Sequence, residues 1–320
     1  MKKFWIVLCS LIMLPCLLLA TGCGESGTPE EPSVPGKFVG GTYKIQTYTV
    51  NGESKTEQIG EVMHFEQGVI TGLDESEIVN FTYDIDDEGA MTLTYAVTNG
   101  NTYTLTGTAD SQTVSFEGEL APGHVAATLK YVKDVQLKLG SYVTSYESIG
   151  GVEQPKGVPF VYTGTSLKDY KDCLTPVSTM GDRIKMTSSE AGHSFTIYGT
   201  ITETSIRFEG DVDGRYVIMV MNYTEDVKIK AGSYKVTSYT VDGATQTEYI
   251  GKINLLGNGN FVDWLGNNVP YKIIGNVIIV DRTSSSQSTL IGTVTPTSVT
   301  FTDTNSAGQK LAMTLVYVQE

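Results

Sequence analysis

The sequence predicts an all-β protein of three tandem small antiparallel meander barrels, with β-sandwiches as the alternative. A twelve-residue opening recurs as GTYKIQTYTVNG from Gly41, GSYVTSYESIGG from Gly140 and GSYKVTSYTVDG from Gly232. Two later landmarks recur in the same order, with spacings of 92 and 93 residues for the first and 92 and 94 for the second: Gly107, Gly199 and Gly292, then Tyr131, Tyr223 and Tyr317. Ordered landmarks at a nearly constant period indicate a triplicated domain.

The repeat divides the chain into units 37–133, 134–227 and 228–320, each long enough to form its own core. Each unit consists of short runs rich in Val, Ile, Thr and Tyr, separated by Gly, Asn and Ser. The connections are too short for crossover helices, so the strands are expected to be antiparallel neighbours. In TVSFEG, Val114 and Phe116 alternate with polar residues, as a strand with one buried face requires.

Small barrels of this kind are expected to have mostly packed interiors rather than open cavities. An eight-stranded barrel is only wide enough to be filled by side chains or to hold one small ligand. The strand VIMVMNY, residues 217–223, is apolar at consecutive positions. We therefore expect both of its faces to be covered, with one packed against a neighbouring unit or loop.

The opening also carries a family resemblance. Gly41–Lys44 and Gly232–Lys235 match a G-[ST]-[WY]-K start, whereas unit 2 has Val143 in the lysine place and one residue fewer before Tyr146. This start, followed by an up-and-down meander, resembles the bacterial lipocalin-like domains found in many lipoproteins. The resemblance implies a barrel and an apolar ligand. Tandem immunoglobulin-like sandwiches are the alternative, although the units lack a Cys…Trp…Cys core.

The N-terminus predicts export and anchoring. Lys2 and Lys3 precede an apolar run, 4–20, so residues 1–22 have the pattern of a signal peptide. Ala20-Thr21-Gly22-Cys23 resembles the lipobox of bacterial lipoproteins, which implies cleavage before Cys23 and a diacylglycerol on its thiol. An ordinary signal peptide and a retained membrane helix are the alternatives. Residues 23–36 then form the lipidated cysteine and a flexible Gly, Ser, Pro and Glu tether.

This reading predicts that the protein lies on the extracytoplasmic face of a bacterial cell membrane, attached to the bilayer through acylated Cys23. Loss of residues 1–22 leaves 20 basic and 36 acidic residues, a formal charge of −16. Binding to nucleic acid depends on Lys and Arg neutralising phosphates, so that class of partner is not expected. The expected partner is instead an unknown protein, a glycan or a small apolar ligand.

The sequence predicts no enzyme, cofactor or metal site. Neither an HExxH nor a GxSxG nor a phosphate-loop motif occurs, and the histidines His64, His124 and His193 have no ligand-like spacing. The acidic stretch DIDDEG, residues 84–89, starts like a calcium loop. The carboxylate expected at loop position twelve is Tyr95, so an acidic hairpin turn is the preferred interpretation.

Two further residues are candidates for particular roles. Cys173 is the only cysteine after Cys23, and the spacing in SLKDYKDCLTP predicts a short helix from Ser166 to Pro176 with Cys173 on its apolar face. Trp264 is the only tryptophan after the signal segment, and with Phe261 it is the candidate for an exposed ligand-binding platform. The alternative for Trp264 is a core or barrel-end position.

The function expected from these features is non-catalytic. The first hypothesis is a membrane-anchored protein whose repeated units bind, adhere or space another module from the membrane. The alternative is a carrier of a small apolar ligand in one open barrel unit. A pocket inside unit 3 that is absent from units 1 and 2 favours the carrier, and three packed interiors with an exposed aromatic patch favour adhesion.

Overall fold

The computed structural model describes residues 36–72, 78–97, 100–120, 123–190, 193–282, 289–304 and 307–319. The predicted signal peptide, Cys23 and the tether up to Pro35 lie outside these ranges. Within them, no helix has the length and apolar character needed to cross a membrane. Gly36–Glu320 form one compact unit by themselves.

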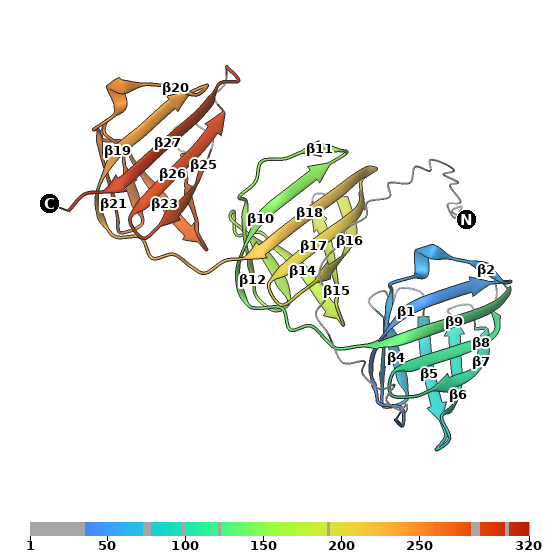
Figure 1. Cartoon of the computed structure of the whole chain (residues 1–320). Coiled ribbons are helices and arrows are strands. Elements are labelled where there is room, and N and C mark those ends of the chain that lie inside the picture. The colour runs from blue at the N-terminus through green and yellow to red at the C-terminus, as the bar shows by residue number, and fades with distance from the viewer. Residues whose placement is uncertain are drawn as a thin grey trace, which may run out of the picture. The chain divides into compact units, whose positions relative to one another are not determined.

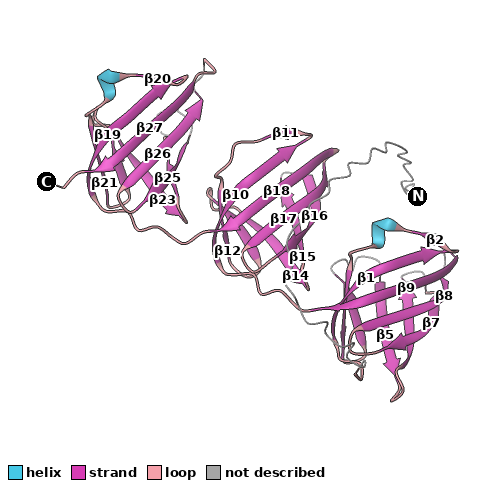
Figure 2. Cartoon of the chain, in the orientation of Figure 1, coloured by secondary structure: helices cyan, strands magenta, loops and turns pink. Residues whose placement is uncertain are grey.

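The chain folds into three closed antiparallel barrels, which confirms the predicted fold class (Figures 1 and 2). In each barrel eight strands follow one another around the sheet, and the first pairs with the last: β1 with β9, β10 with β18, and β19 with β27. A ninth, two-residue strand pairs with the far end of the first strand. In the part of the chain that the structure describes, closure pairs the first and last long strands of each sheet, which excludes the sandwich alternative.

Barrel 1 contains β1 (Gly41–Val50), β2 (Glu53–Ser54), the 3₁₀ turn η1 (Thr56–Gln58), β3 (Val62–Glu66), β4 (Val69–Gly72), β5 (Ile78–Ile85), β6 (Ala90–Val97), β7 (Thr102–Ala109), β8 (Thr113–Leu120) and β9 (Gly123–Val132). Barrel 2 contains β10 (Gly140–Ile149), β11 (Val152–Glu153), β12 (Pro159–Tyr162), β13 (Ser166–Asp169), β14 (Leu174–Met180), β15 (Arg183–Glu190), β16 (His193–Ile201), β17 (Ser205–Val212) and β18 (Arg215–Tyr223). Barrel 3 contains β19 (Gly232–Val241), β20 (Ala244–Thr245), η2 (Thr247–Tyr249), β21 (Ile253–Gly257), β22 (Asn260–Val262), β23 (Asn268–Ile274), β24 (Val277–Val280), β25 (Leu290–Thr295), β26 (Ser298–Thr304) and β27 (Lys310–Tyr317).

Each barrel has its own apolar core, because alternate residues of every strand face inward. The tyrosine of the repeated opening closes one end of each core. Tyr43, Tyr142 and Tyr234 are fully buried. Each hydroxyl donates a hydrogen bond of 2.7–2.8 Å to the carbonyl of the residue four positions earlier. The tyrosine therefore fills the barrel end without leaving its polar atom unpaired.

The first strand of each barrel carries a β-bulge at the same place, which corrects the reading of unit 2. The register shifts after Ile45, Thr144 and Val236, each four residues beyond the opening glycine. Unit 2 therefore lacks no residue. The misreading arose because Glu147 stands at the inward position that tyrosine occupies in the other two barrels, with Tyr146 one place earlier. Burial raises the pKa of the Glu147 carboxyl.

The helix predicted from Ser166 to Pro176 is wrong. This segment forms the β13–β14 hairpin, in which Ser166 pairs with Pro176. The Asp169 carboxylate accepts hydrogen bonds from the amides of Lys171 and Cys173 at 2.8 and 2.9 Å and so stabilises the turn. Cys173 is exposed. Helical spacing over about ten residues is a weak signal, because a helix that short is marginal without packing, whereas this segment has a strand on each side.

The strand at 217–223 also differs from expectation. Met221 is buried, and Val217, Met219 and Tyr223 pack against the core of their own barrel. The alternate residues Ile218 and Val220 face outward and are partly exposed. This strand thus has the ordinary two faces of a barrel strand, with apolar residues on the outer one.

Successive barrels are joined by a repeated contact at each linker. The Asp134 carboxylate accepts hydrogen bonds from Thr42 Oγ1 at 2.7 Å and from the Gly181 amide at 2.9 Å. Asp226 repeats this arrangement one period later, with Ser141 Oγ at 2.6 Å and the Gly275 amide at 2.9 Å. Each aspartate therefore ties the first strand of one barrel to a turn of the next.

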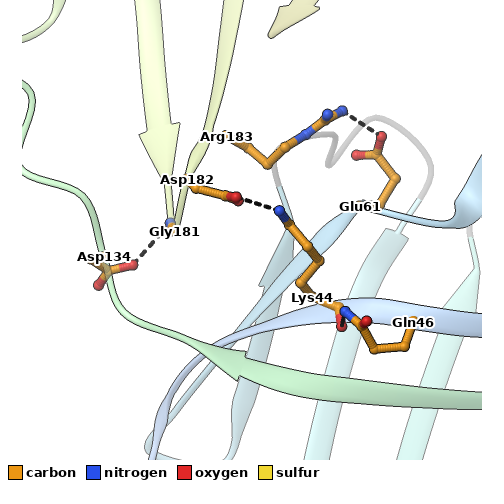
Figure 3. Close-up of polar contacts among 7 residues, drawn as sticks. All are labelled: Lys44, Gln46, Glu61, Asp134, Gly181, Asp182 and Arg183. Atoms are coloured by element: carbon orange, nitrogen blue, oxygen red, sulfur yellow. Dashed lines mark hydrogen bonds and ion pairs between the residues drawn. The ribbon is translucent and has the colours of Figure 1, made fainter. Parts of the chain in front are cut away.

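The first junction also carries two ion pairs (Figure 3). Lys44 of β1 pairs with Asp182, and Arg183 Nη2 lies 2.8 Å from Glu61 Oε1. The four side chains are partly buried, so solvent screens these pairs less than fully exposed ones.

Candidate ligand-binding site in barrel 3

A cavity of about 410 Å³ opens at one end of barrel 3. It lies at the end opposite the buried Tyr234, where β22 ends and β23 begins. Its lining is Phe261, Asp263, Trp264, Leu265, Asn267, Asn268, Val269, Val280, Arg282, Leu290 and Met313. The two residues that the sequence singled out, Phe261 and Trp264, thus lie on the wall of one cavity. Phe261 belongs to the buried core and Trp264 packs against it.

The turn between β22 and β23 positions Trp264 at the mouth. Asp263 Oδ1 accepts hydrogen bonds from the amides of Leu265 and Asn267, both at 2.9 Å. Asp263 Oδ2 accepts a third, from Asn267 Nδ2 at 2.8 Å. An aspartate that accepts hydrogen bonds from the backbone amides of its own turn fixes the backbone on both sides of Trp264. Leu265 at the tip is 75% exposed, so this turn presents an apolar side chain to solvent.

Three aromatic rings form a row along the same end of the barrel. The ring of Trp264 lies 5.7 Å from that of Tyr249 in η2, which lies 4.7 Å from that of Tyr239 on β19. Burial, with smaller contributions from the charges of Tyr249 and Glu248, raises the pKa of Tyr239. These rings offer flat apolar surface with few rotatable bonds, which suits a ligand with an apolar or aromatic body.

The polar part of the lining comes from Asp263, Asn267, Asn268 and Arg282, and Arg282 is its one positive charge. Arg282 follows β24 and its Nη2 lies 3.5 Å from Asp303 Oδ2 on β26, with both side chains about 70% buried. Most of the remaining wall is apolar, from Val269, Val280, Leu290 and Met313. An apolar wall with a few polar groups is the usual composition of a small-molecule site.

The corresponding end of barrel 1 has a different chemistry. A hollow of about 530 Å³ beside η1 is lined by Tyr48, Val50, Asn51, Glu53, Lys55, Glu57 and Gln58. Gln58 stands at the place of Tyr249 in the repeat, and Glu53, Lys55 and Glu57 place charges beside it. In barrel 2 the inward tyrosine of this end is replaced by Glu147. The middle ring of the aromatic row is therefore missing from barrel 1, and the inward tyrosine of the row is missing from barrel 2.

The remaining candidates from the sequence lie elsewhere. His64 Nδ1 is 3.0 Å from Thr42 Oγ1 at the first junction, and His124 Nδ1 is 3.1 Å from Glu119 Oε1. The predicted acidic hairpin turn is confirmed, because Asp86 Oδ1 accepts the amides of Glu88 and Ala90 between β5 and β6. In the ranges that the structure describes, no three His, Cys, Asp or Glu side chains cluster as metal ligands do.

Sequence reasoning missed Tyr249, Arg282 and Met313. Tyr249 had a signal, since aligning TEQIG at Thr56 with TEYIG at Thr247 shows one aromatic gained in unit 3. The other two residues become neighbours of Trp264 only when the barrel closes, and nothing in their local sequence marks them.

No protein-family model and no curated protein matches the chain. Among solved structures, intact Ap-TbpB (N and C lobes) is similar at 12% identity and a TM-score of 0.21, over 92% of this chain and 81% of that one. A double mutant of the vaccine antigen Transferrin Binding Protein B from Haemophilus parasuis Hp5 is similar at 11% identity and a TM-score of 0.21, over 90% of this chain and 79% of that one. A single mutant of the same antigen is similar at 9% identity and a TM-score of 0.20, over 89% of this chain and 78% of that one. At these TM-scores the likeness carries no argument about function.

Proposed function

We propose that the protein is a lipid-anchored, extracytoplasmic and non-catalytic binding protein that takes a small apolar or aromatic ligand at the mouth of barrel 3. The observation that carries this proposal is the cavity in which Phe261 and Trp264 lie together beside a few polar side chains. The carrier hypothesis is favoured over pure adhesion because this cavity reaches Phe261 of the barrel 3 core, although barrel 1 also has hollows of about 530 Å³. Barrels 1 and 2 then space the binding unit from the membrane.

The dimensions of the site set the size of the ligand. Pockets for small molecules have volumes of about 300–1,000 Å³, and the cavity of about 410 Å³ lies near the lower limit. A ligand of one or two fused rings, or an equivalent branched hydrocarbon, fits this volume. The aromatic row of Tyr239, Tyr249 and Trp264 provides the flat surface on which such a ring would lie.

Replacing Met313 by arginine is expected to weaken ligand binding at least about tenfold, because it places a charge in the apolar wall. The probe is N-phenyl-1-naphthylamine, an uncharged compound whose fluorescence rises in apolar surroundings. It would be titrated into residues 36–320, and energy transfer from Trp264, the only tryptophan present, would report binding at this mouth.

The matched control is Met219→Arg in barrel 2. Met219 pairs with Phe208 just as Met313 pairs with Phe301, so the two substitutions disturb equivalent positions. The control is expected to leave energy transfer from Trp264 unchanged. Equal losses in both variants, or no saturable transfer in the unmodified protein, would contradict a ligand site in barrel 3.

The anchor is tested separately, by intact-mass spectrometry of protein extracted from membranes. Cys23→Ala is expected to abolish a diacylglycerol-sized addition and release the protein from the membrane. Cys173→Ala is the control, because that thiol is exposed but lies outside the lipobox-like stretch. An unmodified chain with an intact Cys23 would rule out lipidation and leave the ligand site untouched.

A further inference from the structure

The outer face around the start of β1 in barrel 1 is covered by a turn of barrel 2. This face includes Thr42 on β1 and Val62 on β3, and the β14–β15 turn with Gly181 lies against it (Figure 3). A Cβ on Gly181 would lie 3.0 Å from Thr42 Cγ2 and 3.7 Å from Val62 Cγ1. Val62 is accordingly only 3% exposed.

The second junction repeats this arrangement with apolar contacts. Val143 and Val161 of barrel 2 pack against an apolar cluster around the β23–β24 turn of barrel 3. Pro159 stands at the place of Val62, and it is buried as well. At both junctions, therefore, the turn between the fourth and fifth long strands of one barrel covers the first two long strands of the barrel before it.

Barrel 3 has the same outer face on β19 and β21, and there it is exposed to solvent. Ile253 stands at the place of Val62 and Pro159 and is 44% exposed. Leu255, two residues further along the same side of β21, is 49% exposed. Two exposed apolar side chains, at a face that is covered in the other two barrels, indicate a surface that can receive a partner.

Two lysines border these apolar side chains. Lys235 of β19 pairs in register with Ile253, and Lys252 precedes Ile253 in the chain. Both lysines are exposed. They stand at the places of Lys44 and Glu61 in barrel 1, each of which forms an ion pair with barrel 2. We call Lys235, Lys252, Ile253 and Leu255 the open face. Its two positive charges favour a partner turn that carries acidic groups.

The β5–β6 turn of barrel 1 is the third turn of this set, and it is acidic. Its Gly89 carbonyl accepts the Ala109 amide at 2.8 Å, as the Asp182 carbonyl accepts an amide in barrel 2. Its exposed acids are Asp86, Asp87 and Glu88. Asp87 lies 3.0 Å from Lys37, but both side chains are at least 80% exposed, so this pair holds the turn only weakly.

We propose that the open face of barrel 3 binds the β5–β6 turn of barrel 1 in a second copy of this chain, so that copies associate head to tail. The contact repeats the geometry of the two internal junctions and places carboxylates beside Lys235 and Lys252. Because the two surfaces differ, each bound copy still offers one turn and one face, and association can continue beyond a dimer. The open face lies at the barrel end that Tyr234 closes, opposite the cavity, so the inference does not depend on the ligand site.

The test is sedimentation equilibrium of residues 36–320 up to a concentration of about 1 mM, because so small a contact is weak. At about 0.15 M salt, charges more than about 8 Å apart are largely screened, so local pairs dominate over the net negative charge. The average mass is expected to rise with concentration beyond that of a dimer.

Reversing the charge of either surface is expected to weaken association at least about tenfold, because like charges then meet. One variant carries Lys235→Glu and Lys252→Glu, and the other carries Asp87→Lys and Glu88→Lys. All four changes in one chain bring opposite charges together again and are expected to restore association. Restoration also shows that the substituted barrels still fold.

The matched control is Arg215→Glu with Lys310→Glu, which changes the net charge as much as the lysine pair does. These two residues begin the last strands of barrels 2 and 3, and both are exposed. The control is expected to associate like the unmodified protein. A monomer mass at every concentration, or equal association in all variants, would show that the open face does not bind a second copy. Loss in only one charge-reversed variant, or in both without restoration, would show that the β5–β6 turn is not what the face binds.

Discussion

Replacing Gly199 by alanine is expected to lower the free energy of unfolding of barrel 2 by about 3 kcal/mol, the upper end of the range for a side chain forced into a filled space. A Cβ at this position would lie 2.2 Å from the carbonyl oxygen of Arg207 and 3.1 Å from Ile184 Cγ2. The first of these atoms is backbone in the neighbouring strand, which cannot rotate away. Relief requires β16 and β17 to separate, and this disrupts the hydrogen bonds between them.

Gly210→Ala is the matched control in the same barrel. A Cβ there would meet only Ile197 Cγ1, at 3.5 Å, which is an ordinary van der Waals contact. Its expected effect on stability is within about 1 kcal/mol. Hydrogen exchange measured by mass spectrometry on peptides from β16 and β17 would separate barrel 2 from its neighbours. Equal protection in the Gly199 and Gly210 variants would contradict the steric argument.

The same geometry explains why this glycine recurs in the sequence. Gly107, Gly199 and Gly292 each pair across the sheet with a buried phenylalanine, which are Phe116, Phe208 and Phe301. In each case a Cβ would approach a backbone oxygen of the facing strand to 1.9–2.6 Å. The phenylalanine occupies the space above the glycine, an arrangement that compensates a glycine in a strand. The glycine therefore recurs because the facing strand leaves no room for a Cβ. The sequence shows that the glycine recurs, but only the structure shows the reason.

The sequence was sufficient for the fold class because three copies of each landmark were available. Short alternating strands and the absence of room for helices predicted closed antiparallel sheets, which the structure confirms. Two of the three local errors, at 166–176 and before Tyr146, have a common origin. In both cases the spacing of residues along one segment was interpreted by itself. Which residues of a strand face inward depends on its register with the neighbouring strand, and one segment alone does not show that register.

The candidate site was only partly predictable. Trp264 was noticeable as the sole tryptophan after the signal segment, and Phe261 as its neighbour. Arg282 and Met313 carried no such mark, because they become neighbours of Trp264 only when the strands pair and the barrel closes.

Replacing Tyr234 by alanine is expected to destabilise barrel 3 by about 3–5 kcal/mol, since it removes the aromatic ring that closes the core. Tyr234→Phe retains the ring and loses only the hydrogen bond to the Lys230 carbonyl, so a loss of about 1 kcal/mol is expected near neutral pH. Urea unfolding at pH 8, followed by Trp264 fluorescence, would report this barrel. Similar stabilities of the alanine and phenylalanine variants would contradict the role of the ring.

The phenylalanine variant also predicts a change with pH. Burial, with smaller contributions from Tyr271 and Tyr317, raises the pKa of Tyr234 to about 12, whereas an unfolded tyrosine titrates near 10. A raised folded-state pKa means that this tyrosine's contribution to stability is complete below pH 10 and is lost as the pH rises through 12. Tyr234→Phe has no proton to lose at this position. The stability advantage of the unmodified barrel, about 1 kcal/mol, should therefore shrink above pH 10 and reverse before pH 12, because each pH unit in this range costs the folded tyrosine about 1.4 kcal/mol. Ionisation of the other tyrosines affects both proteins alike. A constant difference across this range would mean that the Tyr234 hydroxyl ionises as easily in the folded barrel as in the unfolded chain.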